Sequence, residues 1–149
     1  METSEALPQM RLLAPNPASV LIMRPFDDTP FNRAMHFRLA EHESESASIA
    51  VSIDPWFEQE NGVVHGAIIA SAADTAAVYA VRSRLEPGEQ MTGVEFKINF
   101  LRPATLDGGE LTAQAHVVKR GRTIAVCDVE VLQAGRAIAA GLFTYLLIR

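Results

Sequence analysis

The last third of the chain alternates between apolar and polar residues with the period of two that indicates β-strands with one buried face. The clearest case is 91–101, where five residues share one face and three share the other: Thr92, Val94, Phe96, Ile98 and Phe100, against Glu95, Lys97 and Asn99. Further strands are predicted at 110–119, 123–132 and 137–148, because short glycine-containing turns separate them. Consecutive strands joined by short turns indicate an antiparallel sheet.

One long helix is predicted at 65–83, because this stretch is rich in alanine, holds no proline and has its only glycine, Gly66, in the first turn. A proline and a glycine at positions 87 and 88 end it. One face of the helix carries mostly small side chains: Ile69, Ala72, Ala73, Ala76 and Ala80. Small side chains let a helix lie close to a curved sheet, so we expect the sheet to wrap around this helix.

The residues before the helix divide into an extension and the first strands. Five prolines within residues 1–30 interrupt regular structure, and we expect an N-terminal extension there with a short helix at 19–23. The compact domain is predicted at 31–149. Its elements before the helix are expected to be strands at 33–40 and 46–53 and a loop at 54–62.

The composition is that of a folded, single-domain protein of 149 residues, with 48% hydrophobic and 21% charged residues. A net charge of −5 argues against broad nucleic-acid binding, which needs a basic surface. The single cysteine, Cys127, excludes a disulfide within the chain and a cysteine-cluster zinc site. Its alternation with Ala125 and Val129 predicts a core position.

Nothing along the chain predicts export or insertion into a membrane. The first residues are acidic, where a secretory signal is basic. The longest mostly apolar stretch, 63–81, contains His65 and Asp74, which a helix spanning a bilayer does not readily accept. We therefore expect a cytoplasmic protein with no membrane partner.

Three stretches of sequence resemble a known family: NGVVHGAIIASAADTAAVYA at 61–80, MTGVEFKINFLRPA at 91–104, and GRTIAVCDVEVLQAGRAIAAGLFTY at 121–145. A His-Gly pair opens the helix, an Asp follows nine residues after the His, and a Thr eighteen residues later opens the next strand: His65, Gly66, Asp74 and Thr92. Over 33–148 the chain resembles the hotdog thioesterase superfamily, most of all its phenylacetate-pathway and 4-hydroxybenzoyl-CoA thioesterase type.

This resemblance implies both a fold and an activity. The fold is an α+β hotdog, in which an antiparallel sheet of five to six strands wraps around one long central helix. The activity is hydrolysis of acyl-CoA thioesters, with coenzyme A as part of the substrate and no separate cofactor. The four histidines show no ligand spacing, so no metal site is predicted: His36, His42, His65 and His116.

Gly66 is the candidate for a backbone N–H that donates a hydrogen bond to the substrate. The first turn of a helix has N–H groups without intrahelical partners, and a glycine there lets a substrate approach the backbone. The resemblance assigns to this N–H the polarisation of the thioester carbonyl. Ala67 stands where the family commonly has a second glycine, and an ordinary loop-to-helix glycine is the alternative interpretation.

Asp74 is the candidate catalytic carboxylate, acting on water as a general base or attacking the carbonyl directly. The residues three and four positions away on the helix include no cation that would pair with it. The alternative is a plain solvent-facing stripe, because Ser71, Thr75 and Arg82 fall on the same side. The resemblance favours catalysis.

Helix geometry separates the two groups within one chain. His65 and Asp74 lie nine residues apart, roughly 13 Å along the helix and on opposite sides of it. We therefore expect a homodimer with antiparallel helices, in which Asp74 of one chain faces Gly66 of the other. Hotdog dimers often pair into tetramers, and the sequence does not give the packing mode.

Three more residues are candidates for the site. Thr92 is expected on the strand face that meets the helix, where its hydroxyl would hold water or hydrogen-bond Asp74. Gln59 lies six residues before His65, where the family has Asn or Gln, and Asn61 is either its competitor or a turn residue. His65 is expected to shape the loop by hydrogen bonding.

Basic residues are the candidates for binding the anionic nucleotide end of coenzyme A, because Arg suits phosphate geometry. The candidate residues are Arg102, Pro103, Lys119, Arg120, Gly121 and Arg122, with Arg136 elsewhere in the sequence. The alternative for the run 119–122 is a solvated turn.

Two other functions remain open. One is a non-catalytic hotdog protein that binds acyl-CoA or lipid. The other is a hotdog enoyl-CoA hydratase or dehydratase, although that branch relies on an Asp–His arrangement that this sequence does not contain. The acyl group cannot be read from the sequence.

Overall fold

The computed structural model describes residues 24–149. The short helix expected at 19–23 lies outside the described residues, as does most of the predicted extension at 1–30. Phe26 is buried and packs edge-on against Tyr79 of the long helix, so the core already includes this residue.

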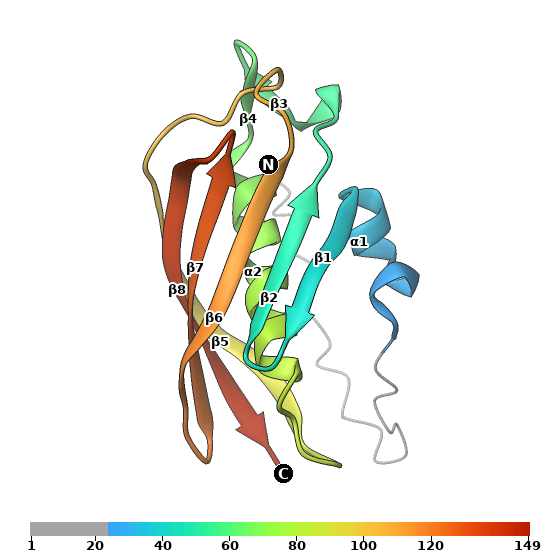
Figure 1. Cartoon of the computed structure of the whole chain (residues 1–149), viewed down its shortest axis with the longest axis vertical. Helices are drawn as coiled ribbons and strands as arrows, with labels where there is room; N and C mark the ends of the chain where they lie inside the picture. Colours follow the sequence, from blue (N-terminus) through green and yellow to red (C-terminus); the bar gives the residue numbers. More distant parts are fainter. Residues whose placement is uncertain (1–23) are drawn as a thin grey trace, which may run out of the picture.

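The predicted hotdog architecture is confirmed. Six strands form one antiparallel sheet in the order β1-β2-β6-β7-β8-β5, and this sheet wraps around the long helix α2 (Figure 1). The elements are η1 (Phe26–Asp28), α1 (Pro30–Ala34), β1 (Phe37–Glu43), β2 (Ser46–Val51), η2 (Pro55–Phe57), β3 (Glu58–Glu60), β4 (Val63–Val64), α2 (Gly66–Arg82), β5 (Gln90–Phe100), β6 (Leu111–Arg120), β7 (Ile124–Gln133) and β8 (Arg136–Ile148).

The small-residue face of α2 forms the core, as predicted. Ala72, Ala76 and Ala80 are fully buried, and the helix packs against β2, β6 and β7. Cys127 of β7 is fully buried, which confirms its predicted core position, and this burial raises the pKa of the thiol to about 12. No helix within residues 24–149 is long and apolar enough to cross a bilayer.

Two predicted elements that precede the long helix in the chain, the strand at 33–40 and the loop at 54–62, were wrong. Residues 33–40 do not form one strand, because helix α1 ends at Ala34 and the strand begins only at Phe37. Pro30 occupies the first helical position, where its fixed φ favours a helix. The expected loop at 54–62 contains strand β3, which forms a small hairpin with β4 just beyond it; the turn residues Asn61 and Gly62 both have positive φ, as a type I′ turn requires.

Strand β5 also differs from the prediction of one buried side. It forms the edge of the sheet, away from the strands that cover α2, and its apolar side chains Val94, Phe96 and Phe100 are 57%, 49% and 54% exposed. A β-bulge between Gly93 and Glu95 breaks the alternation. Its outer edge is unpaired among the described residues.

Candidate active site

The first turn of α2 is organised by His65, the N-cap residue. Its Nδ1 accepts a hydrogen bond of 3.0 Å from the Ala67 N–H, and its own N–H donates to Phe57 O at 2.8 Å. Because Nδ1 is the acceptor, the proton of the neutral ring lies on Nε2. The Gly66 N–H between them has no hydrogen-bond partner among the described residues, so it is available to a bound group.

Gly66 opens onto a surface hollow of about 400 Å³, here called the glycine hollow. It is lined by Gln59, Val63, Val64, Gly66, Ile69, Phe100, Leu101, Arg102, Pro103 and Ala104. The structure therefore brings Gln59 and Gly66 together. A Cβ on Gly66 would lie 3.1 Å from Cζ of Phe100, so the lack of a side chain leaves the backbone open beneath this ring.

Asp74 lies half-buried on α2, at a second hollow of about 410 Å³, here called the aspartate hollow. Its lining residues are Asp74, Gly93, Val94, Glu95, Phe96 and Tyr145. Oδ1 of Asp74 accepts a hydrogen bond of 2.8 Å from the Tyr145 hydroxyl, which also lies 3.3 Å from the Asp74 carbonyl oxygen. The carboxylate is thus held on one oxygen and faces the hollow from the edge of the sheet.

Tyr145 was not among the residues predicted from the sequence. It lies on the inward face of β8 with Phe143 and Leu147, and all three are buried. Burial, together with the adjacent Asp74 carboxylate, raises the pKa of Tyr145 well above its ordinary value, so its hydroxyl stays a donor. Alternation along 143–147 places Tyr145 on the inward face, but the sequence does not reveal its contact with α2.

The predicted face of Thr92 is wrong. Phe96 pairs with the inward Phe143, whereas Thr92 pairs with Leu146, which is on the outward face of β8. The bulge between Gly93 and Glu95 adds one residue and reverses the faces on either side of it. The exposed Thr92 side chain therefore points away from α2. In this chain the hydroxyl that donates a hydrogen bond to Asp74 is that of Tyr145.

The glycine hollow and the aspartate hollow share no lining residue. Gln59, His65 and Gly66 lie together at the start of α2, and Asp74 lies beside Tyr145 further along the helix. One chain therefore does not bring the donor and the carboxylate to a single hollow.

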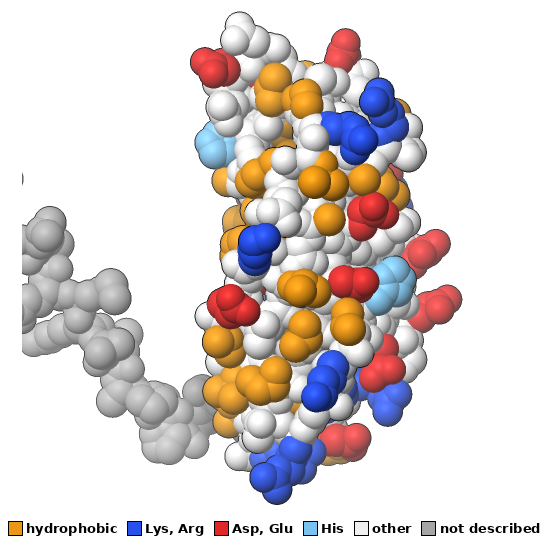
Figure 2. Space-filling view, turned by 90° about the vertical axis from the view of Figure 1, so that its left-hand side faces the viewer, with side chains coloured by type: hydrophobic (Ala, Val, Ile, Leu, Met, Phe, Trp, Pro, Cys, Tyr) orange, Lys and Arg blue, Asp and Glu red, His pale blue; other side chains and the backbone are white. Residues whose placement is uncertain are grey.

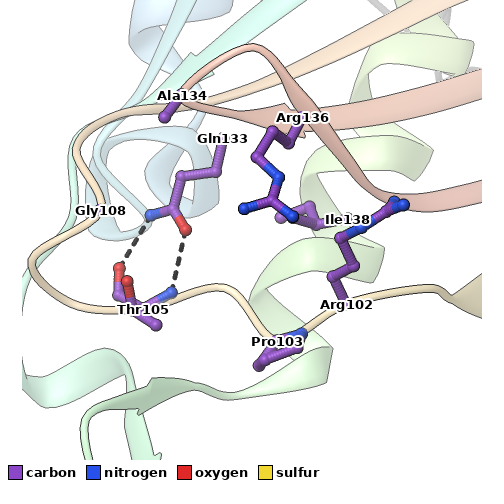
Figure 3. Close-up of a pocket in the computed structure, with 8 residues that line it drawn as sticks. All are labelled: Arg102, Pro103, Thr105, Gly108, Gln133, Ala134, Arg136 and Ile138. Atoms are coloured by element: carbon purple, nitrogen blue, oxygen red, sulfur yellow. Dashed lines mark hydrogen bonds between the residues drawn. The ribbon is translucent and has the colours of Figure 1, made fainter.

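A third hollow, of about 440 Å³, lies beside the glycine hollow and is here called the arginine hollow. Figure 3 shows Arg102 and Arg136 on one side of it and Gln133 with Thr105 on the other. Arg102 is held by a hydrogen bond of 2.7 Å from Nη1 to the carbonyl oxygen of Ala137. Arg102 and Pro103 line both hollows, so the two hollows adjoin.

The loop below the arginine hollow is fixed by the buried Gln133. Its Nε2 donates to the carbonyl oxygens of Thr105 and Gly109 at 2.8 and 2.9 Å, and its Oε1 accepts from the Thr105 N–H at 2.9 Å. A Cβ on Gly108 would lie 2.5 Å from Cδ of Gln133, so a larger residue there would push this side chain away from its hydrogen bonds. No carboxylate lines the arginine hollow.

The basic run at 119–122 lies at the other end of the sheet, in the turn between β6 and β7 (Figure 1). Arg120 does not face solvent freely, because it forms an ion pair of 2.5 Å with the buried Glu89, which Arg149 also contacts. The Glu86 N–H and the Arg120 guanidinium hold the pKa of Glu89 below its ordinary value. Lys119 and Arg122 are exposed at this end of the sheet, whereas Arg102 follows the end of β5 at the opposite end.

Within residues 24–149, no group of three or more His, Cys, Asp or Glu side chains is arranged to hold a metal ion.

Comparison with known proteins gives matches to thioesterases. A family model described as the thioesterase superfamily matches residues 61–140. The medium/long-chain acyl-CoA thioesterase YigI of Escherichia coli is 31% identical over 116 residues, which are 68% of this chain and 74% of that protein.

Solved structures match as well. A thioesterase family protein of Silicibacter pomeroyi is 29% identical with a TM-score of 0.76, and the match covers 83% of this chain and 92% of that one. The PaaI protein of the Escherichia coli phenylacetic acid degradation operon has a TM-score of 0.76 at 24% identity, covering 83% of this chain and 88% of that one. The latter match concerns the fold.

Proposed function

Because the chain belongs to the thioesterase superfamily, we propose that it hydrolyses acyl-CoA thioesters to the free acid and coenzyme A. The observation that carries the proposal is that one helix carries both a held carboxylate, Asp74, and a terminal N–H, that of Gly66, which has no partner among the described residues. The YigI relative is named for medium- and long-chain acyl-CoA, which supports a coenzyme A thioester as the substrate class.

In the proposed reaction the thioester carbonyl oxygen accepts a hydrogen bond from the Gly66 N–H, and the positive end of the α2 dipole stabilises the oxyanion that develops. Asp74 takes a proton from water while the water oxygen forms the new C–O bond. Collapse of the intermediate breaks the C–S bond, and the leaving sulfur takes the proton back from Asp74, which releases coenzyme A as the thiol. Direct attack by Asp74 would instead give an enzyme-bound anhydride that water then hydrolyses. Neither route uses a metal or a separate cofactor.

The remaining candidates have supporting roles in this proposal. His65 holds the first turn of α2 so that the Gly66 N–H points outward. Gln59 lines the same hollow and would orient the thioester or the water with its amide. Thr92 of the same chain points away from Asp74, so a catalytic role for its hydroxyl would require a different contact in the assembled protein.

A homodimer would complete the site. The open edge of β5 and its exposed Val94, Phe96 and Phe100 suit pairing with β5 of a second copy, as edge strands do when they are not protected by charge or proline. Antiparallel pairing would set the glycine hollow of one subunit beside the aspartate hollow of the other. The carboxylate and the N–H, separate in one chain, would then face one substrate.

A tetramer would use the outward face of the sheet. This face also carries exposed apolar side chains: Ile124, Leu142, Leu146 and Ile148. Figure 2 shows hydrophobic side chains in several groups along this side of the molecule, with charged side chains between them. Two dimers would cover these groups by packing sheet against sheet.

The arginine hollow would take the nucleotide end of coenzyme A. Two guanidinium groups without a lining carboxylate suit phosphate, and Arg102 and Pro103 connect this hollow to the glycine hollow, where the thioester would lie. In an antiparallel dimer the 119–122 turn of the second subunit would come toward the same end and add positive charge. Arg120, which is held by Glu89, would contribute least.

Replacing both arginines tests this assignment. In Arg102→Ala/Arg136→Ala we expect KM for acyl-CoA to rise about 10- to 100-fold, because two charged hydrogen bonds to phosphate are lost, with kcat within about threefold of wild type. The matched substrate is the same acyl group on N-acetylcysteamine, which lacks the nucleotide and should show no change in KM. Arg84→Ala, at the other end of α2 and paired with Glu45, is the control variant. An equal loss on both substrates would contradict the assignment.

The activity itself is tested by release of coenzyme A thiol from a panel of short, long and aromatic acyl-CoA substrates. We expect turnover of at least one class. Tight binding of coenzyme A thioesters without hydrolysis of any of them would instead favour the non-catalytic binding protein. Hydration of an enoyl-CoA without thiol release would favour the hydratase.

A further inference from the structure

Tyr145 makes an unusually direct contact with the proposed catalytic carboxylate. Its hydroxyl lies 2.8 Å from Oδ1 of Asp74, and the residue, on the inward face of β8, is 2% exposed. The same hydroxyl lies 3.3 Å from the Asp74 carbonyl oxygen, so it is tied to the helix backbone as well as to the side chain. Strand and helix are thus joined at the catalytic residue.

The two oxygens of Asp74 are not equivalent in this arrangement. Oδ1 is occupied by Tyr145, whereas Oδ2 has no hydrogen-bond donor among residues 24–149. The carboxylate also lines the aspartate hollow, on the side where the β5 edge is open. Oδ2 is therefore the oxygen that remains for water or for the thioester carbon.

We propose that Tyr145 is a positioning residue for the hydrolysis, fixing the Asp74 carboxylate so that Oδ2 is the working oxygen. The inference rests on the proposed function and adds to it a residue that acts only through Asp74. The energy profile for rotation of an Asp carboxylate about χ2 is broad and roughly two-fold, so a carboxylate without a hydrogen-bond partner is not fixed in one orientation. A hydrogen bond from a buried, protonated phenol restricts that rotation, because charge-assisted bonds are about twice as strong as neutral ones.

The bulge in β5 explains why a tyrosine has this role. The hydroxyl expected to reach Asp74 was that of Thr92, but the extra residue in β5 turns Thr92 to the outward face. Gly93 takes the inward position opposite Tyr145 and has no side chain to offer. The long side chain of Tyr145 reaches α2 from the next strand and supplies the missing donor.

Tyr145→Phe removes the hydroxyl and keeps the ring that fills the core. We expect kcat to fall about 10- to 100-fold, since a misplaced reacting group costs rate rather than affinity, while KM stays within about threefold. The control is Tyr79→Phe, which changes the other tyrosine of the chain, a core residue packed against Phe26. It should leave both constants unchanged.

A double-mutant cycle separates positioning from simple support of the fold. If Tyr145 acts through Asp74, Asp74→Asn/Tyr145→Phe should be no slower than Asp74→Asn alone, within about twofold. Assays are run well below the melting midpoint of each variant, so that unfolded protein does not count as lost rate.

Three results would overturn the inference: an unchanged kcat in Tyr145→Phe, a loss of the same size in the Asp74→Asn background, or a rise in KM alone. Each of them leaves wild-type hydrolysis, and so the proposed function, intact. Absence of any wild-type turnover would remove the proposed function together with this role.

Discussion

Asp74→Asn should lower acyl-CoA hydrolysis about 1000-fold or more and leave the fold unchanged. The carboxylate is the base or nucleophile of the proposed reaction, and an amide of the same shape can neither take a proton from water nor attack a thioester. Asn keeps an oxygen that can accept the Tyr145 hydroxyl, so the contact between α2 and β8 should survive.

The measurement is thiol release at saturating acyl-CoA, with circular dichroism and the melting midpoint as the test of folding. Ser71→Ala is the matched control, because this residue lies one turn earlier on the same side of α2 and its hydroxyl bonds only to the Ile68 carbonyl oxygen among the described residues. It should stay within about threefold of wild type, since a helix-internal hydroxyl contributes little. Near-native turnover by Asp74→Asn would contradict the proposed role of the carboxylate.

The parts of the fold that were predictable are those set by local periodicity. An alanine-rich stretch without proline gave α2 to within one residue at each end, and alternation gave β6, β7 and β8. The segment at 33–40 was misassigned because its apolar residues fit either period. There Pro30 at the first helical position, and the positive φ of His36 after the helix, decide the outcome.

The candidate site was predictable where it depends on spacing along one element. His65, Gly66 and Asp74 belong to one helix, and its geometry already separates them. Thr92 was placed on the wrong face because the β-bulge is invisible to alternation: Thr92 and Val94 are compatible with either face of an edge strand.

Two spatial relations required the tertiary structure: that of Tyr145 to Asp74 and that of Arg136 to Arg102. Tyr145 contacts Asp74, a residue 71 positions earlier in the chain, and Arg136 lines the same hollow as Arg102 because β8 begins where β5 ends. No local pattern encodes such contacts. The apolar side chains of β5 are exposed in the single chain although their pattern predicts burial, and the proposed dimer would bury them.

Two inactive variants should restore activity when they are combined, because each proposed site takes Asp74 from one subunit and Gly66 from the other. The partner for Asp74→Asn is Gly66→Pro, which removes the N–H itself. Position 66 is the first residue of α2, where proline is well tolerated, and the extended backbone of His65 (φ −60°, ψ 132°) suits a residue before proline. Alone, Gly66→Pro should lose about 100- to 1000-fold in kcat, the usual loss for one oxyanion donor.

Gly66→Ala is the matched control, since it adds the Cβ that approaches Phe100 at 3.1 Å but keeps the N–H, and it should lose only a few-fold. Coexpression of Asp74→Asn and Gly66→Pro in equal amounts should recover about a quarter of wild-type specific activity, because one site in four draws both groups from unaltered positions. This fraction holds whether two or four chains assemble. If Asp74 and Gly66 of the same chain worked together, every mixed assembly would lack an intact site, and the mixture would stay as inactive as its parents.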